Sequence, residues 1–313
     1  MELLPVSQAF CPAGISSFFE ICNSDESGNP LTDPAKIGSR GGGFAIPRGA
    51  TSRAFVRKST ETRIKIKINS GSAPEAHTTR SAIEQLLKTQ GTTLDVGIDL
   101  KVASPIAAGF GTSAAGTLAS CLAVSDAADI PVTLNQLGRI THEAEVVNQT
   151  GLGTAAALLT GGFVLVTEPG APGIGLVDRL LFPENHSIIC AHIGPVPTRE
   201  TLAKAELAAR VNASAKRTMD AIRQNPTLMT FLAESRKFGQ EAGFETANVT
   251  RLISTMISFG AVGAAQNMIG EAVHGVANDR KVGKIVKAVK KAFPLAKVFA
   301  APIDNQGVRL LGN

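Results

Sequence analysis

Alternating apolar and polar residues dominate the first hundred positions. Residues 62–70 (TRIKIKINS) and 94–104 (LDVGIDLKVAS) carry apolar side chains at every second position, which is the period of a half-buried strand. Residues 9–21 also begin with a strand, and residues 38–46 (GSRGGGFAI) form a glycine-rich bend that leads into one. The chain therefore begins with a part that is rich in strands.

Helical spacing appears in two segments of the same part. Residues 80–91 have an apolar stripe that ends at Gly91, and residues 133–147 have another. Thr133 and Gln136 stand three residues apart at the start of the second stripe, which is the pattern of a capping box. Both segments predict amphipathic helices.

The later part of the chain predicts a mixture of strands, loops and several helices. We expect a strand at 161–166, a loop at 168–175, a strand at 187–194, helices from 198 to 258, a glycine-containing turn at 259–265, two further helices, and a closing strand at 297–304. A chain of 313 residues exceeds what one hydrophobic core organises, which is roughly 250–300 residues. We therefore predict two lobes, 1–184 and 185–313.

Composition excludes several classes of protein. Apolar residues make up 44% and charged residues 18% of the chain, which describes a globular protein and not a disordered one. The absence of Trp and Tyr disfavours single-stranded nucleic acid as a partner, because bases stack on such rings. A net charge of +5 suits an anionic ligand, and the basic stretch 280–291 is interpreted as a solvated helix face.

Location follows from cysteines and apolar runs. The four cysteines are far apart without CxxC pairing, which indicates a reduced protein, and residues 1–10 lack the pattern of a signal peptide. Three uncharged segments, 102–125, 146–167 and 252–270, are long enough for a membrane but are interrupted by polar residues, Gly or Pro. We expect a cytoplasmic protein with no membrane partner.

The strongest chemical signal is PIAAGFGTSAAGTLAS, at 105–120, which follows a predicted strand and leads into a helix of small residues. Such a turn directs free backbone N–H groups and the positive end of a helix at one point. Gly109 and Gly111 allow close approach of an oxygen, and Thr112 and Ser113 add hydroxyls. The segment predicts a phosphate site.

Three phosphate loops compete for this segment. A Walker A loop requires Lys before its Ser or Thr, but Thr117 directly follows Gly116. A dinucleotide fingerprint is matched by Gly109, Gly111 and Ala114, but no acid ends a following strand at the required distance. An NAD-dependent oxidoreductase is therefore the weaker alternative. The third pattern runs from Pro105 through two glycines to two hydroxyl residues and Ala-Ala.

The third pattern resembles the ATP loop of the GHMP kinase superfamily. Further motifs stand in the order seen in archaeal pantoate kinases, and they cover most of the chain: CPAGISSFF (11–19), GSRGGG (38–43), HEAEV (142–146), GLG with GG (151–162), PGIG (172–175) and MIGEAV (268–273). The resemblance implies a two-lobe α+β fold, with an N-terminal lobe like the second domain of ribosomal protein S5 and a ferredoxin-like C-terminal lobe. It also implies transfer of the γ-phosphoryl group of ATP to the 4-hydroxyl of pantoate, in archaeal coenzyme A biosynthesis.

The resemblance also assigns residues. It implies ATP contacts at Pro105, Ala108, Gly109, Gly111, Thr112, Ser113 and Ala114. Ser113 and Glu145 match the Mg²⁺ ligands, and one hydroxyl with one carboxylate is a sufficient protein share for that ion. Ser39, His142 and Thr198 match acceptor-site positions, and Arg40 is a candidate partner for the substrate carboxylate. From the residues alone, an exposed helix charge at Glu145, a surface or satisfied core His at 142 and a surface Arg at 40 remain alternatives.

Three positions depart from the family pattern. Thr154 replaces the Asp of GLGD, Gly14 stands where His is common, and Val166 stands where an Arg often holds the acceptor. Phosphoryl transfer depends mainly on positioning and electrostatics, so a kinase without that Asp is feasible. A GHMP kinase for another small hydroxy acid or alcohol and a non-catalytic nucleotide-binding paralogue are the other interpretations, and a homodimer is a candidate assembly.

Overall fold

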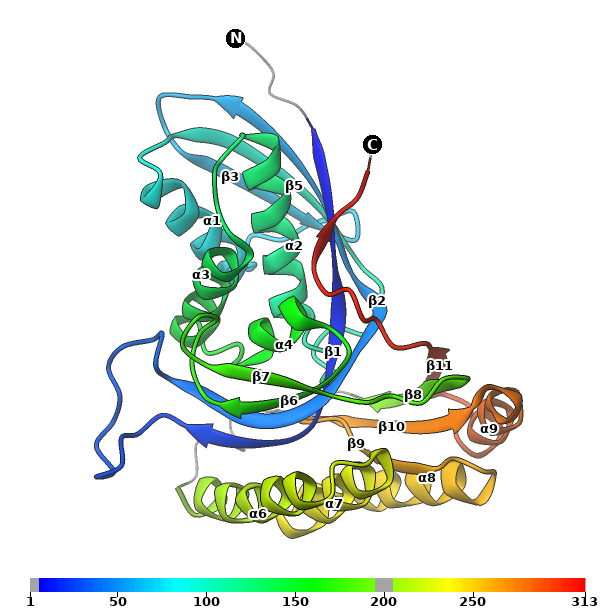
Figure 1. Ribbon diagram of the computed structural model, residues 1–313. Coiled ribbons are helices and arrows are strands. Elements are labelled where there is room, and N and C mark those ends of the chain that lie inside the picture. The colour runs from blue at the N-terminus through cyan, green and yellow to red at the C-terminus, as the bar shows by residue number, and fades with distance from the viewer. Residues whose placement is uncertain (1–5, 195–204, 313) are drawn as a thin grey trace.

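The computed structural model describes residues 6–194 and 205–312, and within them the strands form two sheets (Figure 1). The first sheet has eight strands: β1 (Ser7–Cys22), β2 (Gly38–Lys58), β3 (Arg63–Ile68), β4 (Gly71–Ser72), β5 (Leu94–Val102), β6 (Phe163–Glu168), β7 (Leu176–Leu180) and β12 (Arg309–Leu310). Its path runs β12-β1-β2-β5-β3-β4, and β6 and β7 extend it from the other part of β2. All of these pairs are antiparallel except β3 with β5, which removes the doubly wound parallel sheet that a dinucleotide-binding enzyme would require.

The second sheet has four strands: β8 (His186–Gly194), β9 (Gly263–Gln266), β10 (Glu271–Asn278) and β11 (Lys297–Ala301). Its order, β11-β8-β10-β9, is fully antiparallel and is the order of a ferredoxin-like sheet. The expected α+β architecture is therefore confirmed. The boundary at 184/185 stays a proposal, because β8 begins the second sheet at His186 while β12 returns to the first sheet.

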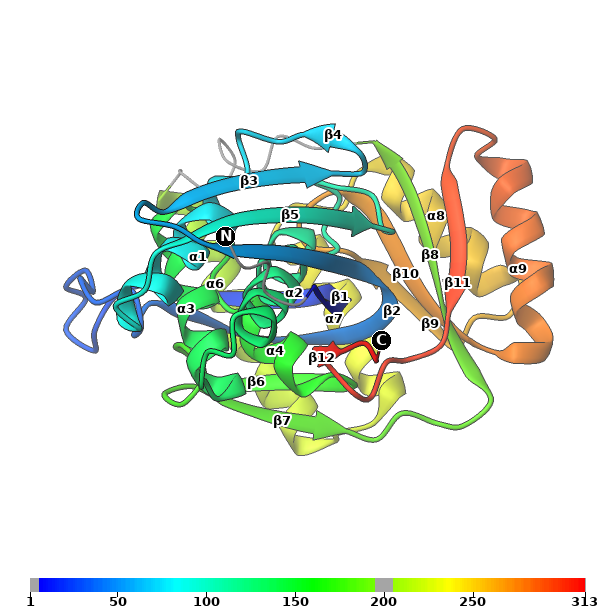
Figure 2. The same cartoon turned by 90° about the horizontal axis from the view of Figure 1, so that it is seen from above.

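Seven further helices accompany α2 (Thr112–Ala127) in the described residues. They are α1 (His77–Thr89), α3 (Leu134–Val147), α4 (Thr154–Thr160), α6 (Ala205–Gln224), α7 (Leu228–Glu241), α8 (Ala247–Ser258) and α9 (Asp279–Ala292). The capping box at Thr133 and Gln136 is confirmed, with both reciprocal hydrogen bonds in place. Seen from above in Figure 2, α9 lies outside β11 at the far edge of the second sheet.

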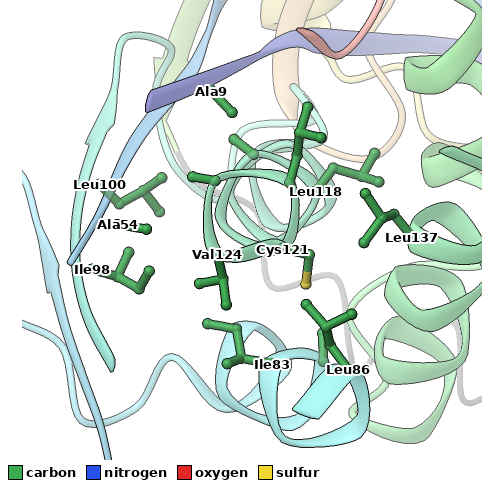
Figure 3. Packing of buried hydrophobic residues seen from close by; sticks show 14 of the residues in the cluster. Ala9, Ala54, Ile83, Leu86, Ile98, Leu100, Leu118, Cys121, Val124 and Leu137 are labelled. Atoms are coloured by element: carbon green, nitrogen blue, oxygen red, sulfur yellow. The ribbon is translucent and has the colours of Figure 1, made fainter. Parts of the chain in front are cut away.

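Helix α2 is the centre of the first core. Most of its side chains are buried, because it packs on β1, β2 and β5 while α1 and α3 pack on its other sides. Figure 3 shows α2 with Ile98 and Leu100 of β5 on one side, Ile83 and Leu86 of α1 on another, and Leu118 on the side of Leu137 of α3. The small residues that make α2 a poor amphipathic helix are thus what allow it to be enclosed on all sides.

Phenylalanines join the first sheet to helix α7. Phe44 and Phe163 of the first sheet stack with ring centroids 4.6 Å apart, and Phe231 of α7 meets Phe163 edge-on at 4.6 Å. Phe18 of β1 likewise contacts Phe238 of α7 at 6.2 Å. These aromatic contacts pack α7, which also contacts β9 of the second sheet, against β1 and β6.

One expected helix was wrong, and other elements were not expected. Residues 271–278 form β10, where we expected the first of two helices, because this segment pairs with β8 on one side and β9 on the other. Helix α4 was not expected, and neither was the strand β7. Residues 38–58 form one long strand that curves to pair with both β5 and β6.

Candidate functional site

The glycine-rich turn joins the end of β5 to the start of α2. Gly111 is the N-cap of α2 and has a φ of 57°, and Gly109 has a φ of 75°, so both require the left-handed conformation that glycine adopts without strain. No side chain caps this end of α2. The N–H groups of its first turn therefore remain available, and they meet the positive end of a 16-residue helix.

The other members of the predicted ATP set lie where the turn bends. Pro105 is half-buried and Ala108 is buried, while Thr112 and Ser113 are half-buried at the start of α2 and Ala114 is enclosed. Phe110 anchors the turn, because its ring is buried 5.7 Å from that of Phe299 in β11. The structure thus collects all seven predicted positions into one turn, and their contacts with ATP stay a prediction.

Ser113 and Glu145 lie together although 32 positions separate them in the sequence. The Ser113 side chain lies near enough to the Glu145 carboxylate to affect its pKa, and Glu145 is only 2% exposed. Burial raises the pKa of Glu145 from 4.5 to about 7, and the nearby Ser113 side chain lowers it by a smaller amount. The exposed-charge alternative for Glu145 does not fit this position.

Glu145 also has an oxygen without a partner. Its Oε2 is buried and accepts no hydrogen bond from the described residues. Gly151 packs against the carboxylate so closely that a Cβ at this position would lie 2.7 Å from Oε2. A buried carboxylate oxygen that nothing satisfies is costly, so this arrangement suits a bound cation.

His142 lies one helical turn before Glu145 on α3 but makes a different contact. The ring is 1% exposed, and its Nε2–H donates to the carbonyl oxygen of Ile37 at 2.8 Å. Burial lowers the pKa of His142, and the hydrogen bond to Ile37 opposes that shift. His142 therefore holds the segment that enters β2, and its role toward a substrate stays a prediction.

Ser39 reaches the candidate site through β2. Its Oγ lies against Gly153, where a Cβ would come within 2.5 Å of the hydroxyl oxygen. Gly153 is the N-cap of α4, so Ser39 lies beside the start of the helix that carries Thr154. Thr198, the fourth acceptor candidate, lies outside the described residues.

Arg40 has a partner in the structure. It stands opposite Glu20 in the β1–β2 register, and its Nε and one terminal nitrogen each donate to a Glu20 oxygen at 2.8 Å. The hydrogen bond to Glu20 raises the pKa of the guanidinium. A substrate carboxylate would have to compete with this bidentate pair, so the hypothesis that Arg40 binds the substrate needs a separate test.

Two of the positions that depart from the family pattern are neighbours. A Cβ on Gly14 would lie 3.3 Å from Thr154 Cγ2, and one on Gly111 would lie 2.7 Å from the same methyl. The Gly14 N–H also donates to the Phe110 carbonyl oxygen at 3.1 Å, which ties β1 to the turn. The Thr154 methyl therefore closes the space between Gly14 and the glycine-rich turn, while Val166 is buried opposite Gly41 in β2.

Some contributors escaped the sequence analysis. In the sequence, Gly151 is visible only as part of a motif, and its contact with Glu145 depends on the loop between α3 and α4. The segment MIGEAV has no role that its letters indicate, and its first residue, Met268, lies against the turn at Gly109. The order of the motifs indicates that these segments belong to the site, but it does not predict which of their residues contact the turn or Glu145.

The comparisons with known proteins agree with this geometry. A sequence profile of the GHMP kinases N terminal domain matches residues 77–162. The chain is 26% identical to a pantoate kinase of Thermococcus kodakarensis, over 93% of this chain and 95% of the relative. It is 28% identical to a pantoate kinase of Methanospirillum hungatei, over 99% and 98% of the two chains.

A solved structure supports the fold at full length. A protein described as a phosphotransferase related to the CoA biosynthesis pathway superposes with a TM-score of 0.86 at 23% identity, and the match covers 98% of both chains. The glycine-rich turn, Ser113 and Glu145 come together inside this shared fold. The chain is thus similar to GHMP kinases at residues 77–162, and over nearly its whole length to pantoate kinases.

Proposed function

We propose that this chain is a pantoate kinase, which transfers the γ-phosphoryl group of ATP to the 4-hydroxyl of pantoate. The observation that carries the proposal is the contact between Ser113 and the buried Glu145 at the start of α2, directly beside the glycine-rich turn. Nearly full-length similarity to pantoate kinases supports the choice of acceptor. Archaeal coenzyme A biosynthesis is the pathway that this activity serves.

The residues present fit a magnesium ion. Glu145 offers a buried oxygen without a partner, and Ser113 offers a hydroxyl beside it. Mg²⁺ is usually held by one or two protein oxygens and completes its shell with water and phosphate. Ser113 and Glu145 would hold the ion, which when bound neutralises charge on the phosphates.

The chain's own groups then bind and orient the nucleotide. The free N–H groups at the start of α2 donate to phosphate oxygens, and the hydroxyl of Thr112 lies at the same helix start. In the transfer, the acceptor oxygen forms a bond to the γ-phosphorus while the bond from that phosphorus to the β–γ bridging oxygen breaks. Thr154 cannot take the acceptor's proton at neutral pH, so the proton leaves to phosphate or water in a loose transition state.

Thr154 favours a second candidate function. Because the structure places a methyl group between Gly14 and the turn, the chain also fits a nucleotide-binding paralogue that has lost turnover. A kinase for a different small hydroxy acid or alcohol is the third possibility. These candidates differ in whether ADP is released and in which acceptor its release requires.

The deciding experiment measures ADP release with Mg-ATP against pantoate, pantothenate, homoserine and mevalonate, and identifies the product by mass. A pantoate kinase gives pantoate-dependent ADP and one equivalent of phosphopantoate. Nucleotide binding with no ADP from any acceptor would support the paralogue, and turnover of a different acceptor would move the enzyme within the superfamily.

The proposal also covers the acceptor contacts, the location and the oligomeric state. We propose contacts with the acceptor at Ser39, His142 and Thr198, a cytoplasmic location and a homodimer. In the described part of the chain, no helix combines the length and the apolar character that a membrane span needs.

A further inference from the structure

The hairpin tip between β9 and β10, residues 267–270, lies against the glycine-rich turn. A Cβ on Gly109 would lie 3.2 Å from Asn267 Cβ and 3.3 Å from the Met268 carbonyl oxygen. On the same side, a Cβ on Gly270 would lie 3.6 Å from the carbonyl carbon of Ala108. The second sheet therefore supports the backbone of the turn through this tip.

A β-bulge in β1 receives the hairpin. The register between β1 and β2 shifts between Ser16 and Phe18, so Ser17 has no residue opposite it. Such a bulge turns a side chain away from its regular direction. The Ser16 carbonyl oxygen accepts the Met268 N–H at 2.8 Å, and the Ser17 hydroxyl lies 2.9 Å from Nε2 of His274 in β10.

His274 continues the chain of hydrogen bonds to Asn267. Its Nδ1 lies 2.8 Å from Oδ1 of Asn267, and all three side chains are fully buried. Burial lowers the pKa of His274 to about 3, so the ring is neutral and one nitrogen donates while the other accepts. The order of donors and acceptors along these hydrogen bonds is then fixed: the Ser17 hydroxyl donates to Nε2, and Nδ1–H donates to Oδ1 of Asn267.

This order leaves the amide nitrogen of Asn267 unused. Nδ2 is buried and has no hydrogen-bond partner among residues 6–194 and 205–312. Two N–H donors without an acceptor are unfavourable in a closed interior, and the neighbouring turn is where we place the phosphates. A phosphate oxygen is an acceptor that would satisfy one of them.

We propose that Ser17 and His274 are positioning residues for the nucleotide: they orient Asn267, hold residues 267–270 against the glycine-rich turn, and present the Asn267 amide nitrogen to a bound phosphate. This inference rests on the proposed function, because its ligand is the ATP of that reaction. It adds a contribution from the second sheet to a phosphate site that otherwise consists of β5, the turn and α2.

The test compares His274→Phe, which keeps a flat ring but removes both hydrogen bonds, with His274→Gln, which retains one donor and one acceptor. The readouts are the Kd for Mg²⁺ with a non-hydrolysable ATP analogue, and the KM for ATP and kcat with pantoate. We expect His274→Phe to weaken binding about tenfold and to raise KM while kcat changes by less than about threefold, and His274→Gln to restore most of the affinity.

Ser17→Ala is the second variant. It removes only one hydroxyl from the hydrogen-bonded series Ser17–His274–Asn267, so it tests the proposal even if His274→Phe does not fold. Amide hydrogen exchange of residues 105–111 in the nucleotide-free protein is the second measurement, and we expect faster exchange in both Ser17→Ala and His274→Phe. Ser52→Ala is the matched control, because it breaks a buried hydrogen bond with Ser120 at 3.1 Å away from the hairpin. We expect that control to leave both nucleotide affinity and exchange at 105–111 unchanged.

The outcomes separate two failures. If the wild-type chain does not bind Mg²⁺ with the ATP analogue, the proposed function and this inference both fall. If the wild type binds and folded Ser17→Ala and His274→Phe bind equally well with unchanged exchange at 105–111, only the inference falls. Equal losses in the Ser52→Ala control would also overturn it, since the effect would then be general loss of stability.

Discussion

The two walls of the candidate site present very different groups. The wall formed by the turn, the start of α2 and Glu145 of α3 offers backbone N–H groups, hydroxyls and a buried carboxylate. The wall formed by β1 and the start of α4 offers Gly14 and the methyl of Thr154. Of these two walls, only the first presents groups that bind a triphosphate, whereas side-chain proton transfer would need a group that the second wall does not present. Nucleotide binding and acceptor chemistry are thus separable in this chain.

The largest loss of function should come from a substitution in the glycine-rich turn of the first wall. Gly111→Ala places a Cβ 2.7 Å from Thr154 Cγ2 at a φ of 57°, and we expect it to reduce nucleotide affinity by about two orders of magnitude. Titration with Mg²⁺ and an ATP analogue measures the loss.

Gly91→Ala is a matched control for that change. Gly91 has a φ of 59°, but a Cβ there meets nothing within 4 Å, so the backbone strain is comparable while the steric conflict is absent. Equal affinities of folded Gly111→Ala and Gly91→Ala proteins would contradict a phosphate site at the turn.

The second effect concerns Glu145. We expect Glu145→Gln to reduce turnover about a hundredfold, because it removes the only charge of the Ser113–Glu145 pair and with it the electrostatic hold on Mg²⁺. Steady-state ADP release measures this loss, and retained turnover together with lost stability would assign Glu145 to structure.

The same side chain predicts a pH dependence of the metal-free protein. Its folded-state pKa of about 7 exceeds the ordinary 4.5, so the folded state binds more protons and the free energy of unfolding falls as pH rises from about 4.5 to 7. This pKa difference corresponds to a loss of about 3 kcal/mol in the free energy of unfolding. Chemical denaturation at pH 5 and pH 8 checks it, and we expect Glu145→Gln to remove most of the difference.

Thr154 tests the second wall and should give a smaller effect. If the wild type phosphorylates pantoate, Thr154→Ala should keep activity within about threefold, because the hydroxyl accepts no proton at neutral pH. Thr160→Ala, at the other end of α4, is the control. Activity that vanishes in Thr154→Ala alone would give the hydroxyl a direct role.

Thr154→Asp sharpens the same question. If the wild type is inert and this variant gains acceptor-dependent ADP release, the chain is a paralogue that lost its carboxylate. In a working kinase, we expect the added charge against the turn to weaken ATP binding a few-fold through repulsion of phosphate. The Kd for the ATP analogue separates these results.

Arg40 should give the smallest effect. Because Glu20 already holds its guanidinium, we expect Arg40→Lys to change the KM for the acceptor by less than about threefold. A tenfold rise in that KM, with an unchanged KM for ATP, would instead establish Arg40 as a ligand of the substrate carboxylate.

Local chemistry explains which features could be predicted from the sequence. The turn depends on glycines at fixed spacing, and the start of α3 depends on Thr133 and Gln136, so both are visible in a few neighbouring letters. The pair of Ser113 and Glu145 was available through the resemblance, since the motif order fixed both positions.

The remaining features depend on partners far away in the sequence. Residues 271–278 form a strand only because β8 and β9 flank them, and nothing in the segment itself names those neighbours. The contact of Arg40 with Glu20 requires the β1–β2 register, and the chain from Ser17 to Asn267 requires a bulge in one sheet to face a strand of the other. Short elements such as α4, with seven residues, also carry too little periodicity to be found.

The return of β12 to the first sheet has a consequence for synthesis. Ala9 pairs with Leu310, and the Val308 N–H donates to the Leu158 carbonyl oxygen of α4, so Figure 1 shows the two ends of the described chain side by side. During translation the outer edge of β1 stays unpaired until the ribosome has passed residue 310, even though the rest of its sheet is available much earlier. The lobe that carries the glycine-rich turn is therefore among the last parts of the described chain to be completed, and an unfinished chain exposes a strand edge that another nascent chain can pair with.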